Sequence, residues 1–250
     1  MRRLALHAAL ALALVLAGCS VLGSDPVREQ RAVDRLNATE ERAETVESYR
    51  YRLSFTATTG DGDTRLSGSG QGAANVTSRR LVTNMTVDGR ETATYVVGDT
   101  AYTECATPGA FWGKENLTTE GDWTRVSPLG RQLALLSTGD LYFNGTETVD
   151  GRETVHISGE PSKDALQEYR EGASSGSLFG GPSVDRTRLH LWVDAETNRP
   201  VRSRFVVTVS GNDETATVRL TTRFGEYGAP VRVTVPEDAR DSAFRGGCPG

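Results

Sequence analysis

Hydrophobic and polar residues alternate with a period of two along much of the chain, which is the pattern of strands with one buried face. The first such strand starts near residue 49, and its apolar face comprises Tyr49, Tyr51, Leu53, Phe55 and Ala57. Further strands are predicted at residues 65–74, 81–87, 93–97 and 101–104, with a hairpin at 147–158. Three amphipathic strands at 189–194, 201–209 and 216–224 are joined by short polar segments and predict an antiparallel meander.

Helical spacing replaces this alternation in three places. Residues 27–47 are predicted to form an amphipathic helix, because Val33, Leu36, Ala43 and Val46 share one face. Shorter helices are predicted at 128–136 and 162–170, while 105–125 and the Gly/Ser-rich 172–183 are expected to be loops. We find neither a repeat nor a break, so the pattern predicts one α+β domain over residues 27–236, followed by a tail at 237–250.

The first eighteen residues have the layout of a secretory signal peptide, with Arg2 and Arg3, an apolar run at 8–17 and small residues before Cys19. The run is shorter than the roughly 20 apolar residues of a permanent membrane-spanning helix. A cysteine directly after Ala-Gly resembles the lipobox of lipoprotein signal peptides. We therefore expect removal of residues 1–18, lipidation of Cys19, a short tether at 19–26, and anchorage at the outer face of the cytoplasmic membrane. An ordinary signal peptide with an incidental cysteine is the alternative.

The charge balance bears on partners. The formal net charge of −5 becomes −7 when the two signal arginines are removed. An acidic chain without a basic cluster in its sequence argues against a nucleic-acid partner. Only Lys114 and Lys163 are lysines, and threonine is abundant. This composition resembles that of surface proteins from salt-adapted archaea or high-GC bacteria, and so suggests a haloarchaeal surface lipoprotein.

Cysteines and glycosylation acceptors point to an exported chain. After Cys19, Cys105 and Cys248 remain, and an even remainder in an exported protein suggests one disulfide, here between the tail and a loop in mid-chain. Two independent buried thiols are the alternative. Five Asn-x-Thr acceptors exceed chance and predict a glycosylated surface. They are Asn37, Asn75, Asn84, Asn116 and Asn144.

Three stretches, residues 95–102, 149–157 and 191–201, together resemble the LolA-like lipoprotein-carrier superfamily, which includes membrane-anchored lipoproteins of the LppX and LprG type. The resemblance implies a curved antiparallel half-barrel sheet, with an N-terminal helix and short helices on the concave side and a hydrophobic cavity between them. It also implies a non-enzymatic protein that binds acyl chains or lipid-modified proteins in that cavity. The apolar strand residues are then either plain core or the lining of that cavity: Leu53, Phe55, Tyr95, Val97, Leu191, Phe205, Val207 and Leu220.

The motifs that could indicate catalysis, a metal site or a cofactor site are better explained by ordinary structural roles. His156 and His190 stand alone on strand patterns without metal-ligand spacing, so we predict no metal and no cofactor. Residues 172–176 match Gly-x-Ser-x-Gly, but a helix precedes them and a loop follows, which disfavours a hydrolase. The glycines at 68, 70 and 72 indicate a bent strand rather than a phosphate loop. The leading hypothesis is an anchored lipid-binding lipoprotein; the alternative is a surface sensor or scaffold that contacts another envelope protein without a ligand.

Overall fold

A computed structural model describes residues 26–105, 111–117, 123, 126–171, 183–211 and 214–248. The expected signal peptide, Cys19 and most of the tether lie outside the described residues, as does the Gly-x-Ser-x-Gly motif. Among the described helices, none is long and apolar enough to cross a membrane.

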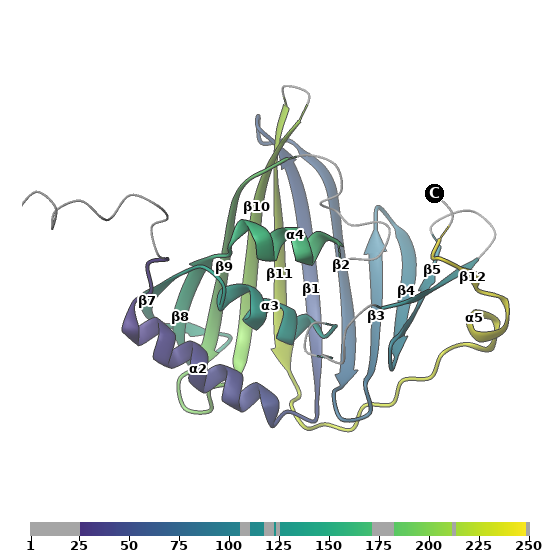
Figure 1. Ribbon diagram of the computed structural model, residues 1–250, viewed down its shortest axis with the longest axis horizontal. Helices are drawn as coiled ribbons and strands as arrows, with labels where there is room; N and C mark the ends of the chain where they lie inside the picture. The colour runs from purple at the N-terminus through teal and green to yellow at the C-terminus, as the bar shows by residue number, and fades with distance from the viewer. Residues whose placement is uncertain are drawn as a thin grey trace, which may run out of the picture.

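One sheet of twelve strands forms the body of the molecule (Figure 1). Its strands are β1 (Ser48–Thr59), β2 (Thr64–Asn75), β3 (Arg80–Val87), β4 (Arg90–Val97), β5 (Thr100–Glu104), β6 (Trp112–Asn116), β7 (Asp140–Val149), β8 (Arg152–Glu160), β9 (Ser183–Asp194), β10 (Pro200–Gly211), β11 (Glu214–Gly225) and β12 (Phe244–Arg245). Their spatial order is β12-β6-β5-β4-β3-β2-β1-β11-β10-β9-β8-β7, and every pair is antiparallel except β12 with β6. The sheet is open, with β7 and β12 at its edges.

The alternation in β1 assigns the two faces of the sheet. We call the face that carries Tyr49, Tyr51 and Phe55 the inner face; these three side chains are at most 2% exposed. The outer face carries Arg50 and Arg52, which are exposed. The predicted alternation of the C-terminal meander is also observed in β9, β10 and β11, whose apolar side chains join the same core cluster as β1. The expected antiparallel sheet with a few short helices is thus observed, and the sheet is open.

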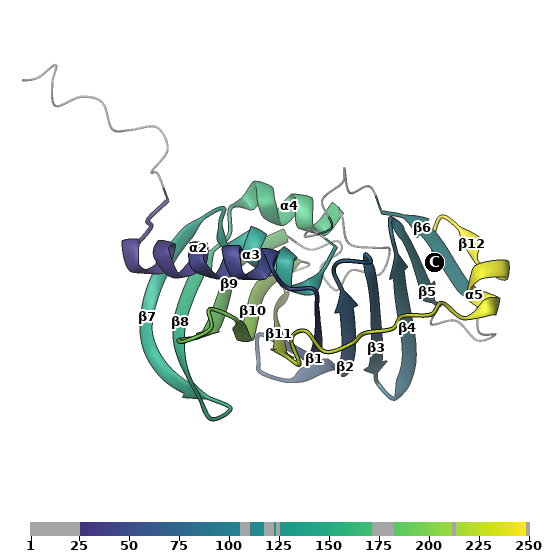
Figure 2. The same cartoon turned by 90° about the horizontal axis from the view of Figure 1, so that it is seen from below.

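The helices α2 (Gln30–Glu44), α3 (Pro128–Leu136) and α4 (Lys163–Glu171) lie on one side of the sheet (Figure 2). α2 packs against β7 and β8 through an apolar stripe that includes Ala32 and Leu36. Ser127 caps α3, because its side chain accepts a hydrogen bond from the Gly130 amide. Pro128 follows at the first helical position, where proline is favoured.

α2 is shorter than the predicted helix at 27–47. Before it, the chain is extended and pairs with β7: the Leu141 amide donates to the Val27 carbonyl, and the Glu29 amide donates to the Leu141 carbonyl. After Glu44, Thr45 caps the C-terminus and β1 begins at Ser48. Edge pairing with β7 therefore replaces the first predicted helical turn.

The segment at residues 229–243, which we call the C-terminal strap, crosses the outer face of β1 to β6 (Figure 2). Its own Val231, Val233 and Val235 are buried against the sheet, and the intervening residues 232 and 234 are exposed. Polar side chains of the sheet hold its backbone, since Asn75 Nδ2 donates to the Val231 carbonyl at 3.3 Å and Arg80 to the Val233 carbonyl at 2.9 Å. The strap includes α5 (Glu237–Ser242).

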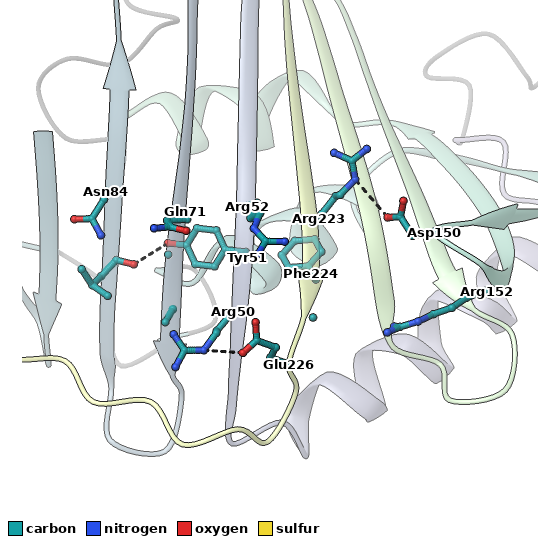
Figure 3. A pocket seen from close by; sticks show the side chains of 14 residues that line it. Arg50, Tyr51, Arg52, Gln71, Asn84, Asp150, Arg152, Arg223, Phe224 and Glu226 are labelled. Carbon is teal, nitrogen blue, oxygen red and sulfur yellow. Dashed lines mark hydrogen bonds and ion pairs between the residues drawn. The ribbon is translucent and has the colours of Figure 1, made fainter. Parts of the chain in front are cut away.

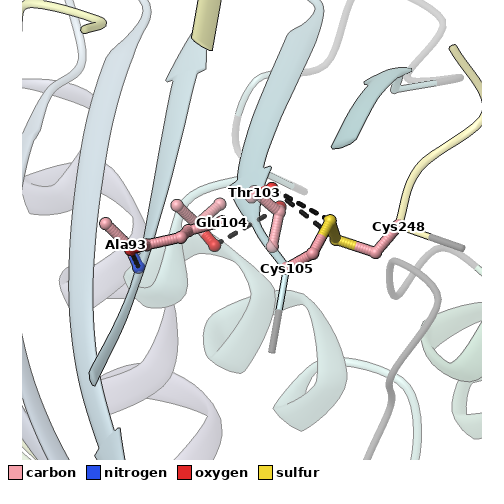
Figure 4. Close-up of a disulfide and its surroundings, with 6 residues drawn as sticks. Ala93, Thr103, Glu104, Cys105 and Cys248 are labelled. Carbon is pink, nitrogen blue, oxygen red and sulfur yellow. Dashed lines mark hydrogen bonds between the residues drawn. A yellow bond between two sulfur atoms is a disulfide. The ribbon is translucent and has the colours of Figure 1, made fainter. Parts of the chain in front are cut away.

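A disulfide fixes the segment that follows the strap. Cys105 and Cys248, 143 residues apart, are bonded with a Cα–Cα distance of 5.4 Å (Figure 4). β12 lies just before Cys248 and pairs with β6, a strand that sequence patterns did not predict because it lies within the expected loop at 105–125. The tail therefore completes one edge of the sheet.

Candidate ligand-binding site

Three glycines of β2 make room on the inner face for aromatic side chains of β1. Gly68, Gly70 and Gly72 lie directly opposite Phe55, Leu53 and Tyr51 in the β1–β2 register. A Cβ at Gly68 would be 2.4 Å from Cε1 of Phe55, and one at Gly72 would be 2.3 Å from Cζ of Tyr51. The two rings thus occupy the positions that side chains on β2 would fill. The glycine pattern that indicated a bent strand serves close packing here.

Apolar side chains beside this glycine row are only partly buried. Leu53 lies next to Gly70, and on the other side of Gly70 lies Met85 of β3. Leu53, Met85 and Leu220 are all of intermediate exposure. We call these three side chains the inner apolar strip. By contrast, four other predicted lining residues are at most 4% exposed and belong to the packed core: Phe55, Leu191, Phe205 and Val207.

Two predicted lining residues lie on the wrong face, so their assignment to the cavity is corrected. Tyr95 pairs with Val82 on the outer face, and its ring packs against Trp112 with centroids 5.8 Å apart. Tyr95 and Val97 belong to the cluster built around Val235 of the C-terminal strap. The strap covers this half of the outer face. The apolar side chains that alternate along β4 therefore pack against the strap and not against the interior of the protein.

The inner face also carries polar groups, and some of them are buried. The Tyr51 hydroxyl hydrogen-bonds with the Thr83 hydroxyl, and burial raises the pKa of Tyr51 well above its usual value. Thr187 faces the interior opposite Val207, is 6% exposed, and its Oγ1 has no hydrogen-bond partner. The Gln132 Oε1 atom in α3 is likewise buried without a partner. An apolar surface interspersed with hydroxyl and amide groups is suited to binding a hydrophobic molecule that carries polar groups.

The two histidines predicted to stand alone are neighbours on the outer face. Nε2 of His156 and Nδ1 of His190 are 3.0 Å apart, and the His156 ring stacks on Trp192 with centroids 4.4 Å apart. Burial, followed by the proximity of His156 and arginines, lowers the pKa of His190 to about 4. The two histidines are 34 residues apart in sequence, on β8 and β9, so only the pairing of these strands reveals their contact.

The glycosylation acceptors differ in accessibility. Asn37, Asn84, Asn116 and Asn144 are exposed. Asn75 uses its amide nitrogen to hold the C-terminal strap. Glycosylation at Asn75 would therefore break a contact of the folded protein, and use of any acceptor stays a prediction.

Comparison with known proteins supports the fold. No protein-family model and no curated protein matches the sequence. Among solved structures, the lipoprotein LppX of Mycobacterium tuberculosis is similar, with a TM-score of 0.50 and 16% identity over 82% of this chain and 100% of that chain. LprF of Mycobacterium bovis has a TM-score of 0.47 and 17% identity over 86% of this chain and 99% of that chain. The architecture is therefore similar to that of LppX, in agreement with the fold that the LolA-like resemblance implied.

Proposed function

We propose that this protein is a non-enzymatic lipoprotein that binds a lipid or acyl chain on the inner face of its sheet and is anchored through Cys19. The observation that carries the proposal is the inner apolar strip, which stays partly exposed on the face that the helices cover. Apolar surface left in water is unfavourable by roughly 25 cal/mol per Å². An acyl chain laid along Leu53, Met85 and Leu220 would remove that surface from water.

The glycine row supports the same proposal. A Cβ at Gly70 would lie 2.6 Å from Sδ of Met85, so the Met85 side chain lies over this glycine and adjoins Leu53 on the inner face. The rings of Tyr51 and Phe55 cover the neighbouring glycines in the same way and are held by close packing. A continuous apolar surface with rigid aromatic neighbours suits a flexible alkyl chain, whose binding needs little directional contact. The fold similarity to LppX supports the architecture and does not identify the ligand.

Native mass spectrometry of the full chain purified from its own membranes tests lipid binding. We expect a co-purifying lipid that is lost in Leu53→Asp, because a carboxylate in the inner apolar strip must be desolvated when a lipid covers it. The matched control is Ser54→Asp, the exposed neighbour on the outer face, which should retain the lipid. Wild-type protein without lipid would refute the proposal and favour the sensor or scaffold alternative.

The anchor is tested separately. Cys19→Ser removes the thiol that would be acylated, so the variant should be released from membranes into the medium or accumulate as an unprocessed precursor. Mass spectrometry of the mature N-terminus measures the lipid directly. Membrane retention of a processed Cys19→Ser variant would contradict anchorage at this residue.

A further inference from the structure

A polar groove on the outer face, away from the inner apolar strip, gathers arginines from several strands. It has a volume of about 420 Å³ and is lined by Arg50, Arg52, Arg152 and Arg223 together with polar residues of β2 and β3 (Figure 3). Two carboxylates also line it: Glu226 pairs with Arg50 at 3.0 Å, and Asp150 pairs with Arg223 at 3.4 Å. Four guanidinium groups against two carboxylates leave a local charge of +2 in a chain whose net charge is −5.

The register of the sheet places like charges beside one another. Arg52 lies directly opposite Arg223 on β11, and Arg223 lies directly opposite Arg202 on β10. Like charges directly opposite on neighbouring strands destabilise a sheet. Arg52 has no ion pair or hydrogen bond within the part of the chain that the structure describes, and Nε of Arg202 is buried without a hydrogen-bond partner. Asp150 compensates Arg223, and the Arg202 guanidinium lies 3.9 Å from the centroid of the Trp192 ring, so Arg52 is the member of the row whose charge a bound anion would compensate.

We propose that this groove is a binding site for a phosphate-type oxyanion, held between Arg52 and Arg223. The planar guanidinium fork matches the oxygens of a phosphate in bidentate fashion. A phosphate monoester carries about −1.5 to −2 charges at pH 7, which matches the local excess of +2 better than the single charge of a carboxylate does. Gln71 and Asn84 border the groove and supply amide groups as further donors. Free phosphate offers this charge and oxygen geometry, whereas the phosphodiester headgroup of an anionic phospholipid such as phosphatidylglycerol offers the same oxygen geometry with one negative charge.

Isothermal titration calorimetry of the full chain in a neutral detergent tests the site. The probes are inorganic phosphate, with sodium chloride at matched ionic strength as reference, and micelles containing phosphatidylglycerol, with phosphatidylcholine as reference. We expect Arg52→Gln to weaken phosphate-type binding about tenfold or more. Arg65→Gln is the matched control, because Arg65 is an exposed arginine of β2 outside the groove, and it should bind as the wild type does.

The outcomes distinguish a free oxyanion from a lipid headgroup as the ligand, and others overturn the site. Binding of inorganic phosphate supports a free oxyanion as ligand, and binding of phosphatidylglycerol micelles alone supports a lipid headgroup. Binding of neither, or equal weakening in Arg65→Gln, overturns the site. Without ligand, Arg52→Gln should melt at the same temperature as the wild type or higher, because it relieves repulsion from Arg223; a lower melting temperature overturns the electrostatic argument. A glycan on Asn84 in the mature protein would fill the groove and also overturn it.

Discussion

Replacing Gly68 by alanine should destabilise the protein, although alanine is normally the better strand residue. The new Cβ would lie 2.4 Å from Cε1 and 2.8 Å from Cζ of Phe55, and 2.8 Å from the Thr86 carbonyl oxygen. Phe55 is 2% exposed, so its ring has little space to move into. Overpacking of this kind costs about 1–3 kcal/mol, while the reduced freedom of the unfolded chain returns about 0.4–1 kcal/mol. We expect a net loss of about 1–2 kcal/mol in the free energy of unfolding.

Urea unfolding measures this loss as a lower midpoint at unchanged slope. Gly225→Ala is the matched control, since a Cβ there meets nothing within 4 Å, and it should be neutral or slightly stabilising. Phe55→Leu removes both ring atoms that clash, so it should cost less stability in the Gly68→Ala background than in the wild type. Equal midpoints for Gly68→Ala and Gly225→Ala, or strictly additive effects of Gly68→Ala and Phe55→Leu, would refute the packing argument.

Three further predictions concern the tail and the histidines. Reduction of the Cys105–Cys248 disulfide, which spans 143 residues, should lower stability by about 2–5 kcal/mol, and the melting temperature of the double serine variant should not respond to reductant. Val233→Asp should cost at least ~2 kcal/mol by burying a carboxylate beneath the strap, whereas Thr234→Asp at the exposed neighbour should not; equal melting temperatures would contradict this. Burial lowers the His190 pKa to about 4, from about 6.5 in the unfolded chain, so stability should be full above pH 6.5 and fall as the pH drops toward 4; an equally steep decline of urea midpoints in His190→Gln would contradict this.

Local alternation predicted the strands well where a single face is buried. In β1 the expected apolar face, from Tyr49 to Ala57, is the face that packs in the core. The same reasoning failed in β4, where Tyr95 and Val97 meet the C-terminal strap. The strap is more than a hundred residues away in sequence, so no local pattern distinguishes a strand face buried by the interior from one buried by a remote segment of the chain.

The groove and the histidine pair could not be predicted for a related reason. Arg52, Arg202 and Arg223 are ordinary outer-face residues in their own strands, and their alignment depends on the β1–β11 and β10–β11 registers. A shift of one residue in either register would have placed the arginine of one strand on the opposite face from the arginine of its neighbour. The disulfide, by contrast, followed from cysteine number alone, because only two cysteines remain after Cys19.

The position of β1 also determines when this domain is able to fold during synthesis. β1 ends at Thr59, yet its neighbour β11 begins at Glu214, so the centre of the sheet stays incomplete until nearly the whole chain has been made. Pairings between such distant segments form slowly and leave apolar strands exposed in the meantime. A nascent chain that has not reached β11 therefore has β2 as the one neighbour of β1, and the apolar face at the centre of the sheet is completed only when β11 is added.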